Sequence, residues 1–145
     1  MKLHNIGCNW SSPCGAFVLA IIYGKSPYFW TRKILQYRNS HKRYTKEYTR
    51  YYGVKYKEDA STCYLTEMLH FLHGIREKKI DLVKRLAIKE LAELLNPRKT
   101  YVIATHDHFL ILRNHRLYDN QWYGKRVEGA HYSDSEVYYI IPLIL

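Results

Sequence analysis

The sequence predicts an α+β domain in which helices come first and an antiparallel sheet follows. Hydrophobic residues make up 47% of the 145 positions and aromatic residues 15%, which is enough for a packed core and excludes a disordered chain. Before Pro97 the chain alternates helix-start and helix-stop signals, whereas after it apolar, β-branched runs alternate with turn residues. No internal repeat or low-complexity linker interrupts this order. We therefore expect residues 1–145 to form one domain, with the N-terminal helices packed on the C-terminal sheet.

The first predicted helix begins at Ser12-Pro13-Cys14 and ends at Gly24. Ser12 is a suitable N-cap, and Pro13 fits the first helical position because its missing N–H is not needed there. Cys14 then falls in the first turn. The run 17–22 is apolar on all sides, so this helix should lie in the centre of the domain.

Three further helices are expected, over 27–38, from Ser61-Thr62 to Gly74, and over 87–95. Ser26-Pro27 repeats the start signal of the first helix, and Asn96-Pro97 ends the last one. The helix over 27–38 should bury four residues, Phe29, Trp30, Ile34 and Tyr37.

Four strands are expected in the C-terminal part of the chain. Residues 100–104, 109–112 and 116–118 are rich in β-branched, aromatic and apolar side chains, and Arg113–Arg116 supplies a turn between the second and the third. A last strand over 136–142 closes the sheet.

The net charge of +10 is concentrated in one segment. Between Arg32 and Lys57 there are nine Lys or Arg residues and one acidic residue, a net +8, together with six tyrosines. Basic side chains bind phosphates and tyrosine rings stack on bases, so residues 37–57 are predicted to be an insertion that binds nucleic acid or an acidic protein. A solvated surface is the alternative. The candidate partner-binding residues are Arg38, Lys42, Arg43, Lys46 and Arg50.

Three cysteines are expected to be free thiols, because their number is odd and no export signal precedes them. A helix N-terminus stabilises a thiolate through its dipole and its free N–H groups, and local sequence places Cys14 there most clearly. Its own backbone N–H would face an oxyanion, with the side-chain amide of Asn9 or Asn5 as second donor. The alternative for Cys14 is a small buried helix residue. Cys8 and Cys63 are interpreted as structural, and Cys8 is the better of the two as an alternative candidate for the reactive thiol.

A cysteine nucleophile needs an imidazole as base, and the imidazole needs an acceptor that sets its tautomer. His108 directly precedes an apolar strand and is well placed to point into a cleft. If Asn114-His115 is a two-residue hairpin turn, Asp119 becomes the diagonal neighbour of His108 on the same face. One additional loop residue would exchange Asp119 for Asn120, so both remain candidates.

A metal site and a membrane segment are both disfavoured. His106 shares the strand parity of His108, but zinc needs a third and a fourth ligand, and the other histidines lack matching spacing. We therefore expect no metal and no cofactor. No apolar run reaches the roughly 18 residues of a membrane-spanning helix, and residues 1–5 contain no apolar secretory segment, so we expect a cytoplasmic protein without a membrane partner.

The chain resembles papain-like cysteine peptidases in two blocks. Ser-Pro-Cys-Gly-Ala-Phe-Val-Leu-Ala-Ile (12–21) resembles the start of their nucleophile helix, and residues 100–112 with 116–120 are similar to their strand, His, strand, turn and Tyr-Asp block. Lys-Arg-Val-Glu-Gly-Ala (125–130) is similar to a run in phage-encoded members. The closer likeness is to those small phage members and to the peptidase domains that trim bacteriocin leaders. It covers about 9–33 and 86–131.

The resemblance implies a papain-like fold, a protein or peptide substrate and a phage-encoded protein that acts in the host cytoplasm. It implies Cys14 as nucleophile, His108 as base and Asp119 as the residue that orients the base. Two positions depart from the family pattern. Cys8 stands where a Gln for the oxyanion hole is usual. Asp107 stands where Gly is frequent, and an acidic residue there is expected to crowd the cleft or raise the pKa of His108.

The expected function is therefore hydrolysis of a peptide or isopeptide bond through an acyl-enzyme, with Asn9 and the N–H of Cys14 stabilising the oxyanion. Trp10 is a candidate lining residue of the cleft. Acyl transfer to an amine remains open. The alternative function is a catalytically weak or inactive scaffold of this kind that binds nucleic acid or an acidic protein through 37–57.

Overall fold

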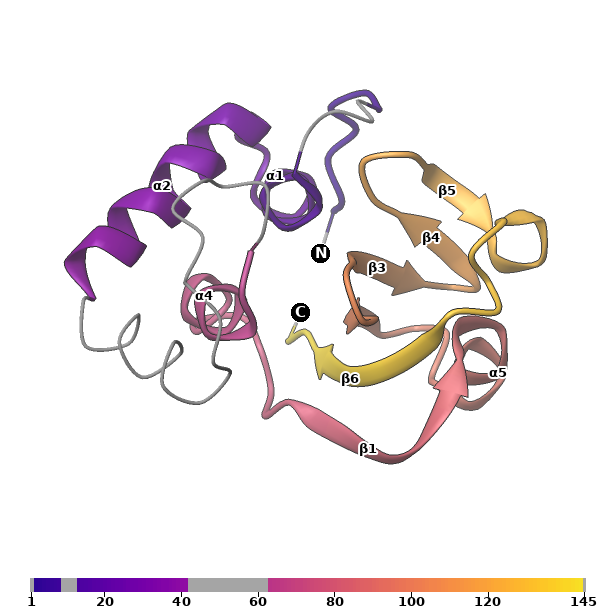
Figure 1. Ribbon diagram of the computed structural model, residues 1–145. Helices are drawn as coiled ribbons and strands as arrows, with labels where there is room; N and C mark the ends of the chain where they lie inside the picture. Colours follow the sequence, from indigo (N-terminus) through magenta and orange to yellow (C-terminus); the bar gives the residue numbers. More distant parts are fainter. Residues whose placement is uncertain (1, 9–12, 42–62, 145) are drawn as a thin grey trace.

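The computed structural model describes residues 2–8, 13–41 and 63–144. These residues form an α+β structure with four α-helices and one six-stranded antiparallel sheet, as the sequence predicts (Figure 1). The helices are α1 (Cys14–Tyr23), α2 (Pro27–Ser40), α4 (Leu65–Phe71) and α5 (Ile88–Leu94). The strands are β1 (Ile80–Ala87), β2 (Thr100–Ala104), β3 (Phe109–Arg113), β4 (Arg116–Tyr118), β5 (Tyr123–Arg126) and β6 (Glu136–Pro142), and a short 3₁₀ turn, η1 (Val127–Gly129), follows β5.

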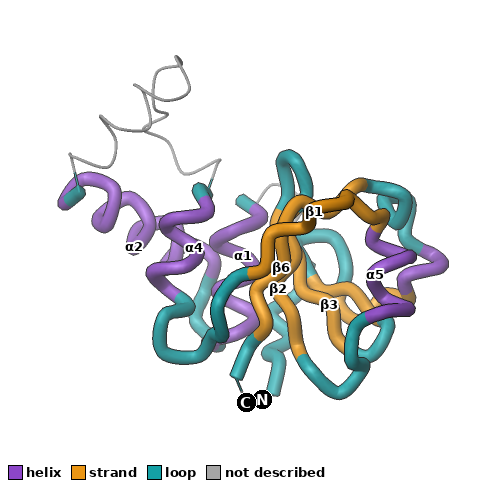
Figure 2. Tube along the Cα trace, turned by 90° about the horizontal axis from the view of Figure 1, so that it is seen from below, coloured by secondary structure: helices purple, strands orange, loops and turns teal. Residues whose placement is uncertain are grey.

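The sheet lies between two layers of helix. Helices α1, α2 and α4 are on one side and α5 is on the other, as the view in Figure 2 shows. The strand order is β1-β6-β2-β3-β4-β5, so β2 and β3 occupy the middle of the sheet. Successive side chains of a strand point to opposite faces. Accordingly Val102 packs in the core with α1, whereas Ile103 packs in the core with α5.

Helix α1 is the central helix of the structure, as expected. All of its residues from Gly15 to Ile22 are buried, and they contact α2 on one side and β3 on the other. Its N-terminal end is therefore held next to the start of β3. Gly24 ends the helix in the left-handed region with a φ of 81°, where a residue without a Cβ is favoured.

The β3–β4 hairpin has the predicted register. Arg113 pairs with Arg116 and Ile111 with Tyr118, which leaves Asn114 and His115 as the two-residue turn. Both turn residues have positive φ, 52° and 59°, as a type I′ turn requires. This register decides which residue lies diagonally across from His108.

Two of the six strands are not predicted by the sequence patterns. The expected order, with all helices before the sheet, is therefore wrong in detail. β1 precedes α5, and both β1 and β5 form the edges of the sheet. Residues 80–87 are largely exposed and carry three charged side chains, so they lack the apolar alternation of a buried strand. β1 exists because β6 provides a partner, and β5 exists because the turn after β4 folds back.

The predicted helix starts are confirmed in part. Ser26 caps α2 by accepting the N–H of Phe29 at 3.1 Å, and Pro27 takes the first helical position. In α1, by contrast, Pro13 itself stands at the N-cap, so the helix begins one residue later than predicted. Ser12, Ser61 and Thr62 lie outside the described residues.

The buried side of α2 also differs in part from the expectation. Trp30 and Ile34 are buried as predicted, whereas Phe29 is 36% exposed because α1 and α4 cover only one side of α2. Across the described ranges, every helix falls short of the length and hydrophobicity needed to cross a bilayer.

Candidate active site

Cys14 occupies the first position of α1, and its side chain is partly exposed. The backbone N–H of Phe109, at the start of β3, points at the Cys14 sulfur with an N–Sγ distance of 3.5 Å. The first N–H groups of a helix have no acceptor within the helix and carry a partial positive charge. The Cys14 sulfur therefore lies where two separate backbone elements favour negative charge.

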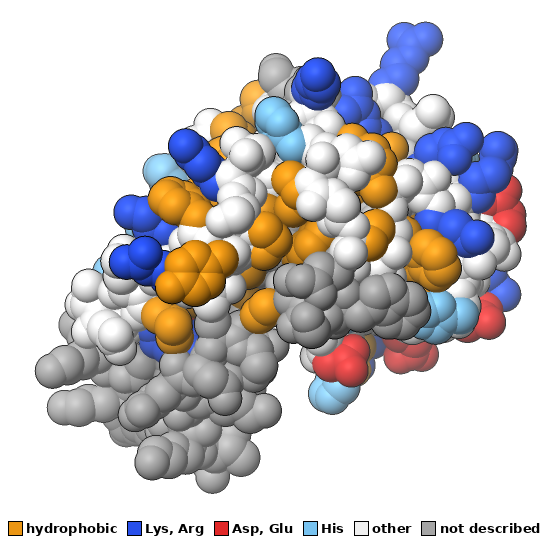
Figure 3. Space-filling model, turned by 90° about the horizontal axis from the view of Figure 1, so that it is seen from above, with side chains coloured by type: hydrophobic (Ala, Val, Ile, Leu, Met, Phe, Trp, Pro, Cys, Tyr) orange, Lys and Arg blue, Asp and Glu red, His pale blue; other side chains and the backbone are white. Residues whose placement is uncertain are grey.

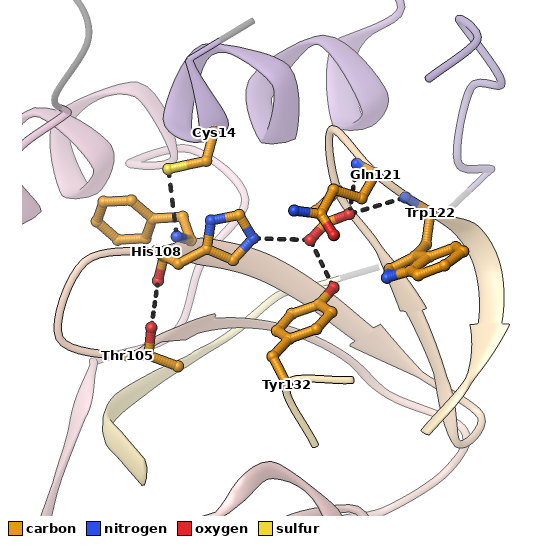
Figure 4. A network of polar contacts seen from close by, with 8 residues as sticks. Cys14, Thr105, His108, Gln121, Trp122 and Tyr132 are labelled. Carbon is orange, nitrogen blue, oxygen red and sulfur yellow. Dashed lines mark hydrogen bonds and ion pairs between the residues drawn. The ribbon is translucent and has the colours of Figure 1, made fainter. Parts of the chain in front are cut away.

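His108 closes the loop between β2 and β3 and is held there by Thr105. The carbonyl oxygen of His108 accepts the backbone N–H of Thr105 at 2.9 Å and its hydroxyl at 3.4 Å. Figure 4 shows these contacts and the His108 ring below the start of α1, near Cys14. The β2–β3 loop thus sets where the imidazole stands relative to the helix.

Asp119 binds the other side of the imidazole. Its Oδ2 lies 2.7 Å from Nε2 of His108 and also accepts the hydroxyl of Tyr132 at 2.5 Å. Its Oδ1 accepts the backbone N–H groups of Gln121 and Trp122 at 2.8 and 2.9 Å. With four donors and an exposure of 1%, the carboxylate is fixed in one orientation (Figure 4). The hairpin register thus selects Asp119, rather than Asn120, as the partner of His108.

This environment keeps the imidazole protonated. Burial by itself lowers the pKa of His108, but the hydrogen bond to Asp119 and the nearby Cys14 sulfur outweigh burial and raise the pKa to about 9. Since Nε2 is bound to Asp119, Nδ1 is the nitrogen that faces the sulfur. At neutral pH the arrangement therefore favours a cationic imidazole bound to the Asp119 carboxylate.

The pKa values of Asp119 and Tyr132, the two residues packed against His108 on the sheet side, are shifted in opposite directions. Burial opposes ionisation of Asp119, but its hydrogen bonds to His108, Tyr132 and two backbone N–H groups hold the pKa below the ordinary value. Burial and the adjacent Asp119 carboxylate raise the pKa of Tyr132, which stays a neutral donor. The ring of Tyr132 also meets the His108 ring edge-on, with centroids 5.6 Å apart.

The other two cysteines have less reactive surroundings. Cys63 is buried, and burial raises the pKa of its thiol well above the ordinary value, helped by the carboxylate of Glu67. Cys8 is exposed, but partial burial and the charge of Asp119 raise the pKa of its thiol as well. Because a cysteine reacts as its thiolate, Cys8 and Cys63 are both poorer candidates for a reactive cysteine than Cys14.

A pocket of about 230 Å³ opens beside Cys14 and His108. One wall is the loop 105–109 before β3, and the other is formed by residues 63–65 before α4 together with Tyr139 of β6. Its lining combines polar side chains, such as Thr105 and Asp107, with apolar ones, such as Leu65, a mixture that suits a peptide segment.

The structure corrects the expectation for Arg38. Its guanidinium makes two hydrogen bonds to the Glu67 carboxylate, with Nε and Nη2 at 2.7 and 2.8 Å, and both side chains are buried. This pair joins α2 to α4, so Arg38 is not presented to an external anion. On the face drawn in Figure 3, Lys and Arg side chains of the described residues lie at both ends rather than in one patch.

Several other predicted residues cannot be placed. Asn9, Trp10, Lys42, Arg43, Lys46 and Arg50 lie outside the described residues, as does most of the segment 37–57. Asn5, the second candidate for an oxyanion donor, is exposed and its side-chain oxygen accepts the N–H of Gly7. Within the described ranges no group of three or more His, Cys, Asp or Glu side chains is arranged to hold a metal ion.

Sequence reasoning missed three contributors to the site. Tyr132 follows η1 and carries no local signal for a role at Asp119, because its position depends on how the chain returns from β5 to β6. Thr105 and the N–H of Phe109 act through the shape of the β2–β3 loop, and loop conformation is not encoded in a periodic pattern. Asp107 departs from the expectation too, because it does not contribute to the raised pKa of His108.

Comparison with known proteins assigns neither a family nor a function to this chain. No family model matches this chain, and no curated protein or solved structure matches it either. The interpretation of the site therefore depends on its geometry and on the chemistry of its residues.

Proposed function

We propose that this chain is a papain-like cysteine peptidase that hydrolyses a peptide or isopeptide bond, with Cys14 as nucleophile, His108 as acid and base, and Asp119 as the residue that positions His108. The observation that carries the proposal is that the His108 imidazole binds a buried carboxylate on one side and lies next to the sulfur of a helix-start cysteine on the other (Figure 4). In line with the sequence resemblance, the proposal includes a phage-encoded origin and action in the host cytoplasm.

The first half of the reaction uses the charge distribution already present. In the reactive form the proton of the Cys14 thiol is already on Nδ1 of His108, and the thiolate attacks the substrate carbonyl carbon, forming a C–S bond. As the tetrahedral intermediate collapses, the C–N bond breaks and the imidazolium donates its proton to the leaving amine. The acyl group then remains on Cys14 and His108 is neutral.

The second half regenerates the thiol. Neutral His108 removes a proton from water, the resulting oxygen nucleophile attacks the thioester carbon, and the C–S bond breaks. Asp119 acts through His108: its bond to Nε2 keeps Nδ1 directed at the reacting atoms and stabilises the imidazolium. An amine in place of water would complete an acyl transfer by the same steps.

The negative oxygen of the tetrahedral intermediate requires donors near Cys14. The backbone N–H of Cys14 belongs to the first turn of α1, where the helix supplies no acceptor for it. We assign it as one donor and keep Asn9 as the proposed second donor.

The test is covalent labelling with a peptide that carries a thiol-reactive electrophile, followed by mass spectrometry of the modified cysteine. We expect one label per chain, on Cys14. His108→Ala should slow labelling by roughly 10²-fold or more, the range typical of losing a catalytic acid or base. Asp119→Ala should slow it less, because the imidazole remains.

A matched measurement separates an enzyme from an inactive scaffold. The wild-type chain should hydrolyse a peptide library, and Cys14→Ala should not. Equal labelling of Cys8, Cys14 and Cys63, or labelling of Cys14 that is unaffected by His108→Ala, would refute the peptidase and favour a binding protein on this scaffold.

A further inference from the structure

The pocket beside Cys14 and His108 carries one carboxylate at its edge, that of Asp107. Asp107 lies in the β2–β3 loop between His106 and His108, is exposed, and lines the pocket. It stands one residue from the base but adds nothing to the raised pKa of His108. Among the described residues, no hydrogen bond or ion pair joins its carboxylate to the residues of the site.

Among the described residues, the charged groups around this pocket are paired with groups other than Asp107. Lys79, whose ammonium lies 5.9 Å from the centre of the Tyr139 ring, is paired with Asp81. Arg38, over the ring of Tyr64, is paired with Glu67. Within the described residues Asp107 has no ion-pair partner. The imidazolium of His108, which also lines the pocket, is paired with Asp119, so Asp107 gives the pocket lining a carboxylate that is not paired with any described residue.

The rest of the pocket is suited to a long apolar chain. Its inner wall contains Cys63, which is buried, and the partly buried side chains of Leu65 and Tyr139. A lysine or arginine side chain has an apolar stem and a charged head, and such side chains bury the stem while the head stays near water. An inner apolar wall with an acidic edge matches that distribution.

We propose that this pocket binds a lysine or arginine side chain of the substrate, at one fixed position next to the scissile bond, and that Asp107 determines this preference. The inference rests on the proposed peptidase function. It explains why an acidic residue is tolerated directly before the catalytic histidine: the carboxylate contacts substrate.

The experiment is digestion of a peptide library prepared from a bacterial proteome by cleavage after acidic residues, with every new end mapped by mass spectrometry. We expect Lys and Arg to be enriched at one position relative to the cut. Matched peptides with Lys or norleucine at that position differ only in the charged head. The Lys peptide should have a kcat/KM about fivefold higher, the scale of a partly exposed ion pair, and the ratio should shrink with added salt.

Variants connect the preference to Asp107. Asp107→Asn should remove the difference between the Lys and norleucine peptides, and Asp107→Lys should shift the enrichment to Asp and Glu. Asp134→Asn is the matched control, because Asp134 is an exposed acidic residue of another surface pocket. It should leave the preference unchanged.

The outcomes separate this inference from the peptidase function. Cleavage that depends on Cys14 but shows no basic preference, or a preference that persists in Asp107→Lys, overturns the role of Asp107 while the peptidase stands. If the wild-type chain cuts no peptide and Cys14 is not labelled, the proposed function falls and this inference falls with it.

Discussion

The Nε2 atom of His108 lies 2.7 Å from Oδ2 of Asp119, although the two residues are diagonal and not direct neighbours across the β3–β4 hairpin. The contact forms because Asp119 ends β4 in a tight turn, where its backbone N–H bonds the carbonyl of Trp122 at 2.8 Å. Its side chain is thereby turned toward the start of β3. This one contact sets the tautomer, the charge and the direction of the imidazole.

The pKa of His108 should be about 9 and should depend on Asp119. Asp119→Ala removes the strongest hydrogen bond that favours the imidazolium, so the pKa of His108 should fall toward the ordinary value near 6.5. NMR titration of the imidazole carbon-bound protons measures it. Tyr132→Phe, which keeps the carboxylate, should lower the pKa less. An unchanged pKa in Asp119→Ala would contradict the assigned contact.

Stability should decline on the alkaline side of neutrality because of His108. The folded pKa is raised from 6.5 to about 9, so the stabilisation is fully present below pH 6.5 and is lost as pH rises through 9. The shift corresponds to a loss of up to about 3 kcal/mol in the free energy of unfolding. Urea unfolding at pH 6, 7.5 and 9 measures it. His108→Gln should flatten this part of the profile.

At acid pH, Asp119 makes the free energy of unfolding depend on pH in the opposite direction. Its pKa is lowered in the folded state, so its contribution is present above the unfolded pKa of 3.8 and is lost as pH falls. Asp119→Asn should therefore weaken the acid-side dependence of the unfolding free energy, again measured by urea unfolding. If the free energy of unfolding of the variant fell with decreasing pH as steeply as that of the wild type, other carboxylates would dominate the acid-side dependence.

Tyr132→Phe should reduce the proposed peptidase activity without removing it. The variant deletes one of four donors to Asp119 but keeps the ring that packs against His108. A lost hydrogen bond to a charged group is worth about 1.5–3 kcal/mol. We expect a fall in kcat of roughly 10- to 100-fold with little change in KM, because Tyr132 does not line the substrate pocket. A change confined to KM would place Tyr132 in substrate binding.

Gly15→Ala should destabilise the fold beside Cys14. A Cβ at this position would lie 2.2 Å from Cβ of Cys63, so either α1 or the segment before α4 must move. Forced overpacking of this kind costs about 1–3 kcal/mol. Thermal unfolding measures it. Gly74→Ala is the control, because a Cβ there meets nothing within 4 Å, and its melting temperature should stay close to that of the wild type.

Arg38→Ala should act on folding and not on an external contact. Removing one partner of a buried ion pair leaves the Glu67 carboxylate without its counter-charge, which costs about 3–5 kcal/mol. Chemical unfolding of the variant measures the loss. Arg98→Ala, at an exposed arginine, should change stability by no more than about 0.5 kcal/mol. A stable Arg38→Ala protein would indicate that the pair contributes little.

Local signals in the sequence were sufficient for the elements that depend on neighbours along the chain. The cap at Ser26, the stop at Gly24 and the turn at Asn114-His115 each depend on backbone preferences of a few residues. The turn in particular set the register and hence the choice of Asp119 over Asn120. An α+β order with Cys14 at a helix start and His108 at a strand start was therefore predictable.

Only the tertiary structure decided what distant segments do to each other. The edge strands β1 and β5 exist through their partners, Arg38 is buried because Glu67 faces it from another helix, and Tyr132 reaches Asp119 from a separate loop. In each case the stabilising free energy comes from burial and from pairing between residues that are far apart in the chain. No pattern along the sequence reports such contacts, since their strength depends on the three-dimensional environment that the fold creates.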